Sequence, residues 1–137
     1  MPGNESSDNP MKMKHLKFIL TPAIIATLVA LFGSNARAEL SEAEAREYLK
    51  RGALVVDVRT VEEFKARSLT NVINIPLDEV KTKFPAVVTN KSEVVLLHCR
   101  SGRRSGIAVG QLQTLGYTNV FSIGSFEKAE KILGARK

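Results

Sequence analysis

The stretch Glu93-Val94-Val95-Leu96-Leu97-His98-Cys99-Arg100-Ser101-Gly102-Arg103-Arg104-Ser105 decides the fold of this chain. Its first six residues form a short, almost continuously apolar run, which is typical of a strand buried on both faces in a parallel sheet. A turn rich in arginine follows, and residues 105–115 then place Ala108, Leu112 and Leu115 on one helical stripe. The stretch therefore predicts a buried strand, a tight turn and a helix.

The same alternation of strands and helices continues on both sides of this stretch. Ser41 and Glu44 have the spacing of a capping box, which predicts a helix that ends at Gly52. Further strands are predicted at 53–58, 72–75 and 119–123, and further helices at 61–66 (capped by Thr60), 77–84 and 125–133, with a loop at 85–92. Strands separated by helices predict an α/β fold with a central, mostly parallel sheet and helices on both faces.

Residues 1–38 have the composition of a leader and signal peptide. Basic residues are followed by an uncharged apolar run at 18–32, and the small residues Ala36 and Ala38 come next. These three regions in this order predict a secretory signal peptide, with an uncleaved membrane anchor or a buried core helix as the alternatives. We expect cleavage after Ala38, a periplasmic or otherwise exported location, and a folded domain at 39–137. Contact with a membrane is expected only through an uncleaved signal segment.

The composition excludes several classes of site. Cys99 is the only cysteine, so the chain can form neither an intrachain disulfide nor a multi-cysteine zinc site, and we expect no bound metal. The net charge of +6 suggests anionic partners. With 6% aromatic residues and no tryptophan, the chain does not have the pattern of a nucleic-acid-binding protein.

Cys99 stands where a reactive thiol is expected. It closes the buried strand and opens a loop in which Gly102 allows a sharp turn and three arginines follow within five residues. Backbone N–H groups of such a turn and the following helix N-terminus favour a thiolate. An unpaired cysteine in an exported protein is either an intermolecular link or a reactive thiol. The alternative is a small apolar residue buried at a strand end.

Four segments in this order resemble the rhodanese family. They are Cys99–Ser105 (family pattern C-R-S-G-x-R-S), Asp57–Arg59 with Glu63 and Phe64 (D-V-R…E-[FY]), Asn74–Leu77 (N-I-P-L) and Leu115–Val120 (L-G-[YF]-x-x-V). The resemblance covers nearly all of residues 41–130. Because a signal segment precedes these motifs, the chain is most similar to the periplasmic single-domain rhodaneses of the phage-shock type. The resemblance implies a rhodanese-like fold for residues 39–137.

The resemblance implies a sulfurtransferase that works through a persulfide on Cys99. A small anionic donor such as thiosulfate would supply the sulfur, a thiol or cyanide would accept it, and no cofactor beyond the covalent persulfide is expected. The expected substrate-binding residues are Arg100, Ser101, Gly102, Arg103, Arg104 and Ser105. Backbone N–H groups of residues 100–104 would cradle the persulfide, and Arg100 and Arg103 would hold the sulfite-like end of the donor.

The sequence departs from the family pattern at three places. Residues 66–71 replace the usual G-H-I-P-G-A, Gly124-Ser125 replaces a common Gly-Gly, and His98 precedes the cysteine. Because neighbours alternate across a strand, we expect His98 to point away from the sulfur. Asp57 and Arg59 stand at a strand end, where they would brace the catalytic loop or form a local ion pair or cap.

Two other functions remain open from the sequence. The His-Cys pair is similar to cysteine-dependent phosphatases and arsenate reductases, whose C-x5-R pattern requires an arginine at position 105, where this chain has Ser105. The shorter loop, which ends at Arg104, suits a single sulfur better than a tetrahedral phosphate. A catalytically silent binding module of the same fold is the second alternative, although such modules usually lack the cysteine.

Overall fold

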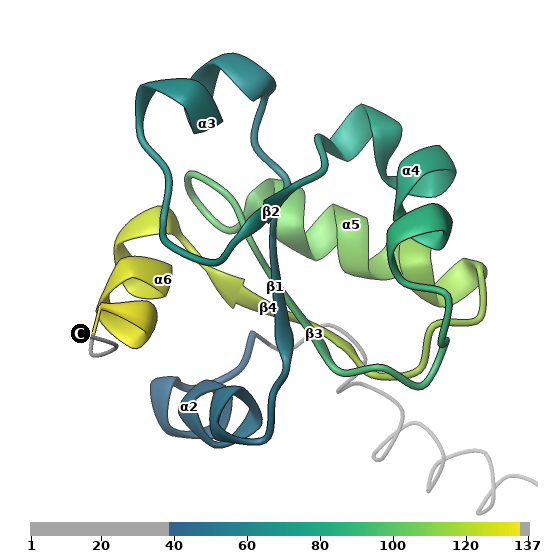
Figure 1. Cartoon of the computed structure of the whole chain (residues 1–137), viewed down its shortest axis with the longest axis horizontal. Helices are drawn as coiled ribbons and strands as arrows, with labels where there is room; N and C mark the ends of the chain where they lie inside the picture. Colours follow the sequence, from purple (N-terminus) through teal and green to yellow (C-terminus); the bar gives the residue numbers. More distant parts are fainter. Residues whose placement is uncertain (1–38, 135–137) are drawn as a thin grey trace, which may run out of the picture. The chain divides into compact units, whose positions relative to one another are not determined.

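Two continuously apolar segments form the centre of a four-stranded parallel sheet (Figure 1). The computed structural model describes residues 39–134, and the strands are β1 (Leu54–Asp57), β2 (Ile73–Asn74), β3 (Val95–His98) and β4 (Val120–Gly124). Their order across the sheet is β2-β1-β3-β4, so the two buried strands β1 and β3 lie side by side. The predicted α/β fold with a parallel sheet is confirmed.

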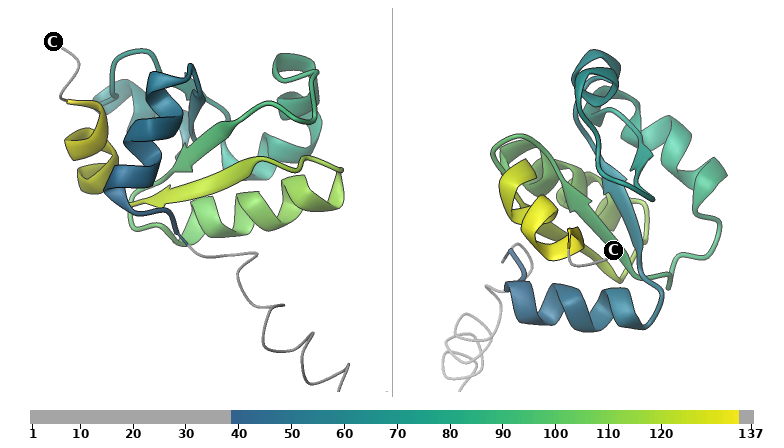
Figure 2. Two further views of the ribbon diagram at one scale, coloured as in Figure 1. Left: turned by 90° about the horizontal axis from the view of Figure 1, so that it is seen from below. Right: turned by 60° about the vertical axis from the view of Figure 1, so that its left-hand side comes forward.

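Helices cover both faces of the sheet, as expected (Figure 2). On one face lie α2 (Glu42–Lys50) and α6 (Phe126–Leu133), which pack through Leu49 and Ile132 on Val55 and Leu96. On the other face lie the 3₁₀ turn η1 (Leu77–Glu79), α4 (Val80–Val87) and α5 (Arg103–Thr114), whose core includes Phe84. The short helix α3 (Val61–Ala66) follows β1 directly. The sheet therefore separates two apolar cores.

Local capping fixes where two of the helices begin. Ser41 and Glu44 form the predicted capping box of α2, with each side chain accepting from the other residue's backbone N–H. Thr60 and Glu63 form a second capping box at α3. Each box satisfies backbone donors that have no partner inside the helix. The second box also holds Glu63 close to the end of β1.

The structure corrects three of the predicted boundaries. The predicted helix at 77–84 is a 3₁₀ turn followed by α4, which extends to Val87 and contains Pro85. The predicted strand at 72–75 pairs only through Ile73 and Asn74. The third corrected boundary, the start of α5, matters most. This helix begins at Arg103 rather than at Ser105. Two of the arginines after Cys99 therefore belong to the first turn of a helix.

The order in which successive strands are added to the sheet changes sides between β1 and β3. From β1 the chain moves outward to β2, and from β3 it moves to β4 on the other side. Ligands in open α/β sheets bind at the carboxyl ends of the strands at such a point. Asp57 and His98 pair in register there, and Cys99 follows directly.

The predicted signal segment at 1–38 lies outside the described residues. Within residues 39–134, none of the helices is long and apolar enough to cross a membrane.

Candidate active site

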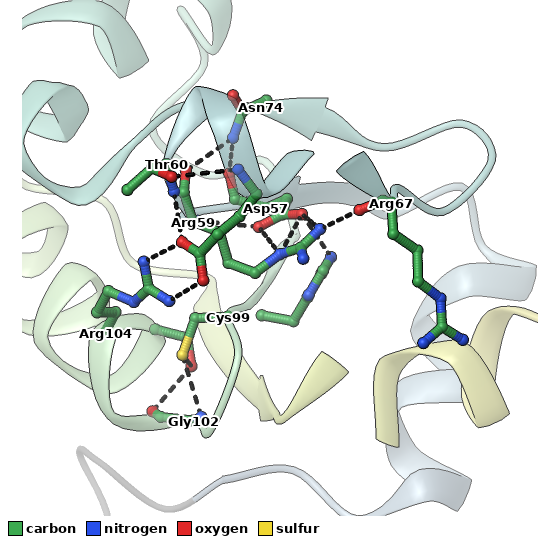
Figure 3. Close-up of polar contacts among 11 residues, drawn as sticks. Asp57, Arg59, Thr60, Arg67, Asn74, Cys99, Gly102 and Arg104 are labelled. Atoms are coloured by element: carbon green, nitrogen blue, oxygen red, sulfur yellow. Dashed lines mark hydrogen bonds and ion pairs between the residues drawn. The ribbon is translucent and has the colours of Figure 1, made fainter. Parts of the chain in front are cut away.

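The Cys99 sulfur lies at the start of α5. The backbone N–H of Gly102 donates to Cys99 Sγ at 3.0 Å (Figure 3). Gly102 is the N-cap of α5, a helix of 12 residues whose partial positive end therefore faces the sulfur. Both effects stabilise negative charge on sulfur, as a thiolate or as the terminal atom of a persulfide.

Gly102 has a backbone conformation that side chains disfavour. Its φ is +94°, and a Cβ there would lie 3.3 Å from the Cα of Gly124. A non-glycine residue in this left-handed region costs roughly 1–2 kcal/mol. This glycine therefore allows the chain to turn back onto the sulfur and enter α5 within three residues.

Two buried serines support the loop from behind. Ser105 Oγ donates to the carbonyl oxygen of Gly102 at 2.9 Å and lies 2.8 Å from Ser122 Oγ. Ser122 Oγ in turn accepts from the N–H of Gly124 at 3.2 Å. Ser105 is completely buried, and its Oγ is 3.8 Å from Cys99 Sγ. Expected as a substrate-binding residue, Ser105 is placed where it positions the loop.

Arg104 is bound to the chain itself by a two-point ion pair. Its two terminal nitrogens donate to the carboxylate of Glu63 at 2.6 and 2.8 Å (Figure 3). The hydrogen bond from Arg104 lowers the pKa of Glu63 to about 2, so this carboxylate stays ionised across the neutral range. The charge of Arg104 is therefore largely compensated, and the pair ties α3 to the first turn of α5.

Arg100, Ser101 and Arg103 are exposed around the sulfur. The backbone of Arg100 accepts from Phe126 N at 3.3 Å, and Ser101 forms an isolated bridge with Ser125. These two contacts tie the loop to the beginning of α6. Among the described residues, the side chains of Arg100 and Arg103 have no ion-pair partner, so both guanidinium groups are available to an anion near the loop.

Asp57 and Arg59 form a buried ion pair beside β3. Arg59 Nη2 donates to Asp57 Oδ2 at 2.7 Å, and the side chains are 8% and 0% exposed. Arg59 also donates to the carbonyl of Arg67 at 2.6 Å and lies 4.3 Å from the centre of the Phe126 ring. Among the described residues no hydrogen bond joins this pair to Cys99. It supports the loop indirectly, because Phe126 binds the backbone of Arg100.

His98 points away from the sulfur, as the alternation of strand residues predicts. Its ring packs edge-on against Phe126 at 5.8 Å between centres, and its Nε2 is 3.8 Å from Asp57 Oδ2. Cys99 packs on the opposite face with the core under α5. Burial lowers the pKa of His98, and neither ring nitrogen has a hydrogen-bond partner among the described residues. The neutral imidazole is therefore the form that fits this position.

Sequence reasoning missed the parts of the site that come from other elements. The sequence indicates Glu63 only as part of a motif, and it places Ser122 and Phe126 only in a strand and a helix. Glu63 could have been found, because it caps α3 and the motif places it close to a strand end. Nothing in the sequence alone indicates that Ser122 and Phe126 contact the loop.

One protein-family model matches almost all of the residues that the structure describes. The model of the rhodanese-like domain matches residues 41–131. The chain belongs to this family. Thiosulfate sulfurtransferase PspE of Escherichia coli K12 is 38% identical over 72 residues, which are 53% of this chain and 69% of that protein. The predicted rhodanese resemblance is thus confirmed.

Solved structures of similar proteins show the same fold. A rhodanese with anions from E. coli superposes with a TM-score of 0.54 and 35% identity, and covers 56% of this chain and 91% of that one. The human single-domain sulfurtransferase TSTD1 has a TM-score of 0.59 and 25% identity, over 68% of this chain and 95% of that one. Within residues 39–134, no group of three or more histidine, cysteine, aspartate or glutamate side chains is placed to hold a metal ion.

Replacing Glu63 by glutamine should impair the site while leaving the fold stable. Loss of the carboxylate frees Arg104 and loosens the first turn of α5, so we expect kcat/KM for sulfur transfer to fall about tenfold, or 1.4 kcal/mol. The melting temperature should change little, because both side chains are more than a quarter exposed. Glu62→Gln, on the same helix, is the matched control, and equal activities of the two variants would contradict this role of Glu63.

Acid should destabilise the fold through His98. Burial lowers the pKa of His98 in the folded state below its value in the unfolded chain. As the pH falls below about 6.5, His98 therefore binds a proton in the unfolded chain but stays neutral in the folded one. The melting temperature should therefore drop by on the order of a few degrees between pH 7.5 and 5.5. His98→Asn should flatten this dependence, as measured by calorimetry. An unchanged slope in the variant would show that other groups cause it.

Proposed function

We propose that this chain, a rhodanese-like sulfurtransferase, moves sulfane sulfur from a small anionic donor such as thiosulfate to a thiol or cyanide through a persulfide on Cys99. The observation that carries the proposal is the Gly102 N–H bound to Cys99 Sγ at the N-terminus of α5. Such a site stabilises an anionic sulfur without a metal ligand or a general base. The name of PspE, a thiosulfate sulfurtransferase, supports the choice of donor.

In the first half-reaction, the Cys99 thiolate attacks the outer sulfur of thiosulfate. A new S–S bond forms, the bond to the sulfonate sulfur breaks, and sulfite leaves with the electron pair. The product on the enzyme is a persulfide anion, whose terminal sulfur needs the N–H donors that the thiolate needed before. The exposed Arg100 and Arg103 are the groups that would attract the dianionic donor and release sulfite.

In the second half-reaction, an acceptor thiolate or cyanide attacks the terminal sulfur of the persulfide. The acceptor becomes a persulfide or thiocyanate, and Cys99 leaves as a thiolate. This step restores the starting state, so the two half-reactions together need neither an oxidant nor a reductant. The positive end of α5 stabilises the leaving thiolate in this step as well.

Access to the sulfur requires movement of the loop. Cys99 is 0% exposed in this structure. The donor can therefore reach Sγ only after residues around the sulfur shift. Ser101 bridges to Ser125 and the carbonyl of Gly102 accepts from Ser105, so a shift of either loop residue breaks one of these contacts.

We also propose that the chain is exported and cleaved after Ala38. The new first residue would then be Glu39, whose carboxylate binds Lys128. Leu40 N donates to the carbonyl of Ser122 at 2.9 Å, next to the serines that support the loop. Cleavage at this position would therefore retain these two contacts of the segment that enters the domain.

Cys99→Ser should abolish sulfur transfer, since a hydroxyl is far less nucleophilic than a thiolate at neutral pH. After incubation with thiosulfate, the wild-type mass should rise by one sulfur, about 32 Da, and cyanide should remove it. Activity of the variant above a tenth of wild type would exclude Cys99 as the nucleophile. Hydrolysis of p-nitrophenyl phosphate, measured in parallel, tests the phosphatase alternative, and an unmodified, inactive wild type would favour a silent module.

Export is tested by fractionation of cells that express the whole chain. The protein should be found in the exported fraction, and its N-terminal sequence should begin at Glu39. Ala36→Arg should block cleavage, because the peptidase requires a small residue there, and should retain the longer form. Uncleaved wild-type protein in the cytoplasm would contradict the signal-peptide prediction.

A further inference from the structure

A groove runs along the solvent side of α5, beginning at the catalytic loop. It has a volume of about 450 Å³ and extends from Arg103 to Thr114, with Lys81 of α4 on its other side. A volume of this size is in the range of ligand-binding clefts, roughly 300–1,000 Å³. Arg103 directly follows Gly102, whose N–H binds the Cys99 sulfur. The groove therefore begins one residue after the glycine whose N–H binds the sulfur, although Cys99 itself is not among its lining residues.

The floor of the groove is open because two glycines stand one helical turn apart. At Gly106 and Gly110, a Cβ would meet no atom within 4 Å. Between them Ile107 is 40% exposed, which makes it one of three large apolar side chains exposed among the described residues. Glycine inside a helix lowers helix stability compared with alanine. Within the described residues there is space for a side chain at both positions, so packing does not explain the two glycines. A segment bound against the helix would explain them.

The charge of the groove selects an anionic occupant. Lys81 and Arg103 line it, and no aspartate or glutamate is among its lining residues. Neither cation forms an ion pair within residues 39–134. Gln111 also lines the groove, but its side-chain oxygen is buried and does not face an occupant. The groove thus offers two cations and an apolar contact to whatever binds there.

The length of the groove indicates a peptide rather than a small molecule. From Arg103 to Thr114 the helix axis rises about 16 Å, at 1.5 Å per residue. A small thiol that reaches the sulfur cannot also span this length. An extended segment of about five residues does, at roughly 3.3 Å per residue.

We propose that this groove, the α5 groove, binds an acidic segment of a protein acceptor whose cysteine receives the sulfur. The inference rests on the proposed function and names the acceptor class of the same site. The acceptor cysteine would lie at the Arg103 end, with its acidic residues between Lys81 and Arg103. Its thiolate attacks the terminal sulfur of the Cys99 persulfide, the Cys99–sulfur bond breaks, and the acceptor leaves as a persulfide.

The test uses two synthetic eight-residue peptides as acceptors, with the full chain as the enzyme. Both carry one cysteine at the first position, and one has glutamate at four positions where the other has glutamine. With thiosulfate as donor, we expect kcat/KM to be about tenfold higher for the acidic peptide at low salt, and the preference to fade as salt rises. Cyanide serves as an acceptor too small to use the groove.

Four variants, two of them controls, separate the groove from the catalytic loop. Lys81→Glu should remove the preference for the acidic peptide and leave the cyanide rate within about twofold of wild type. The matched control Arg51→Glu changes the net charge equally at the C-cap of α2, a helix on the opposite face of the sheet, and should keep the preference (Figure 1). Gly110→Gln fills the groove and should lower transfer to both peptides, whereas Gly110→Ala should not.

A binding measurement makes the result independent of catalysis. The same peptides with serine in place of cysteine, carrying a fluorophore, should bind the wild type more tightly in the acidic form and lose this difference in Lys81→Glu. Absence of transfer to cyanide with intact peptide binding would overturn the proposed function but not the groove. The α5 groove would be overturned if the two peptides were used equally, or if the Lys81 and Arg51 variants had equal effects. It would also be overturned if transfer to a small thiol that carries two carboxylates depended on Lys81 in the same way as transfer to the acidic peptide.

Discussion

The rest of the site depends on the turn at Gly102, where the chain reverses after a buried strand and begins a helix beside the sulfur. The turn needs a positive φ of 94°, a short path from Cys99, and a helix that starts at once. Together these place one N–H and the positive end of α5 on the same atom. A later start of the helix would remove both from the sulfur. The start of α5 at Arg103 is therefore what brings both the N–H and the helix end to the sulfur.

Three separate networks hold this turn, and each comes from a different part of the chain. The serine pair Ser105 and Ser122 holds it from behind through β4. The Arg104–Glu63 pair holds the first turn of α5 against α3. Phe126, packed against Arg59, binds the loop backbone from α6. Because each network is anchored on an element at the carboxyl edge of the sheet, the parallel topology is what brings them to one place.

The sequence was sufficient for the fold because each element carries its own local signal. Continuous apolar runs indicated β1 and β3, and the spacing of Ser41 and Glu44 indicated the first capping box. The site was predictable only along the chain, at the Cys99 loop and its glycine. Contacts across the chain, such as Glu63 with Arg104 or Phe126 with the loop, depend on how strands pair and helices pack. The predicted helix boundaries were wrong where tertiary contacts override local preference, as at Pro85, which lies within α4.

The position of Arg104 also explains why this loop suits sulfur rather than phosphate. A phosphatase of this loop type needs an uncompensated arginine that closes around a tetrahedral anion. Here the last arginine stands one residue earlier, in the first turn of α5, and both of its terminal nitrogens are bound to an ionised Glu63. What remains within the turn is one N–H at 3.0 Å from the sulfur, and the exposed Arg100 and Arg103 are the arginines without an ion-pair partner among the described residues of this loop. A single additional sulfur atom needs little more than this, whereas a phosphate needs several donors converging from all sides.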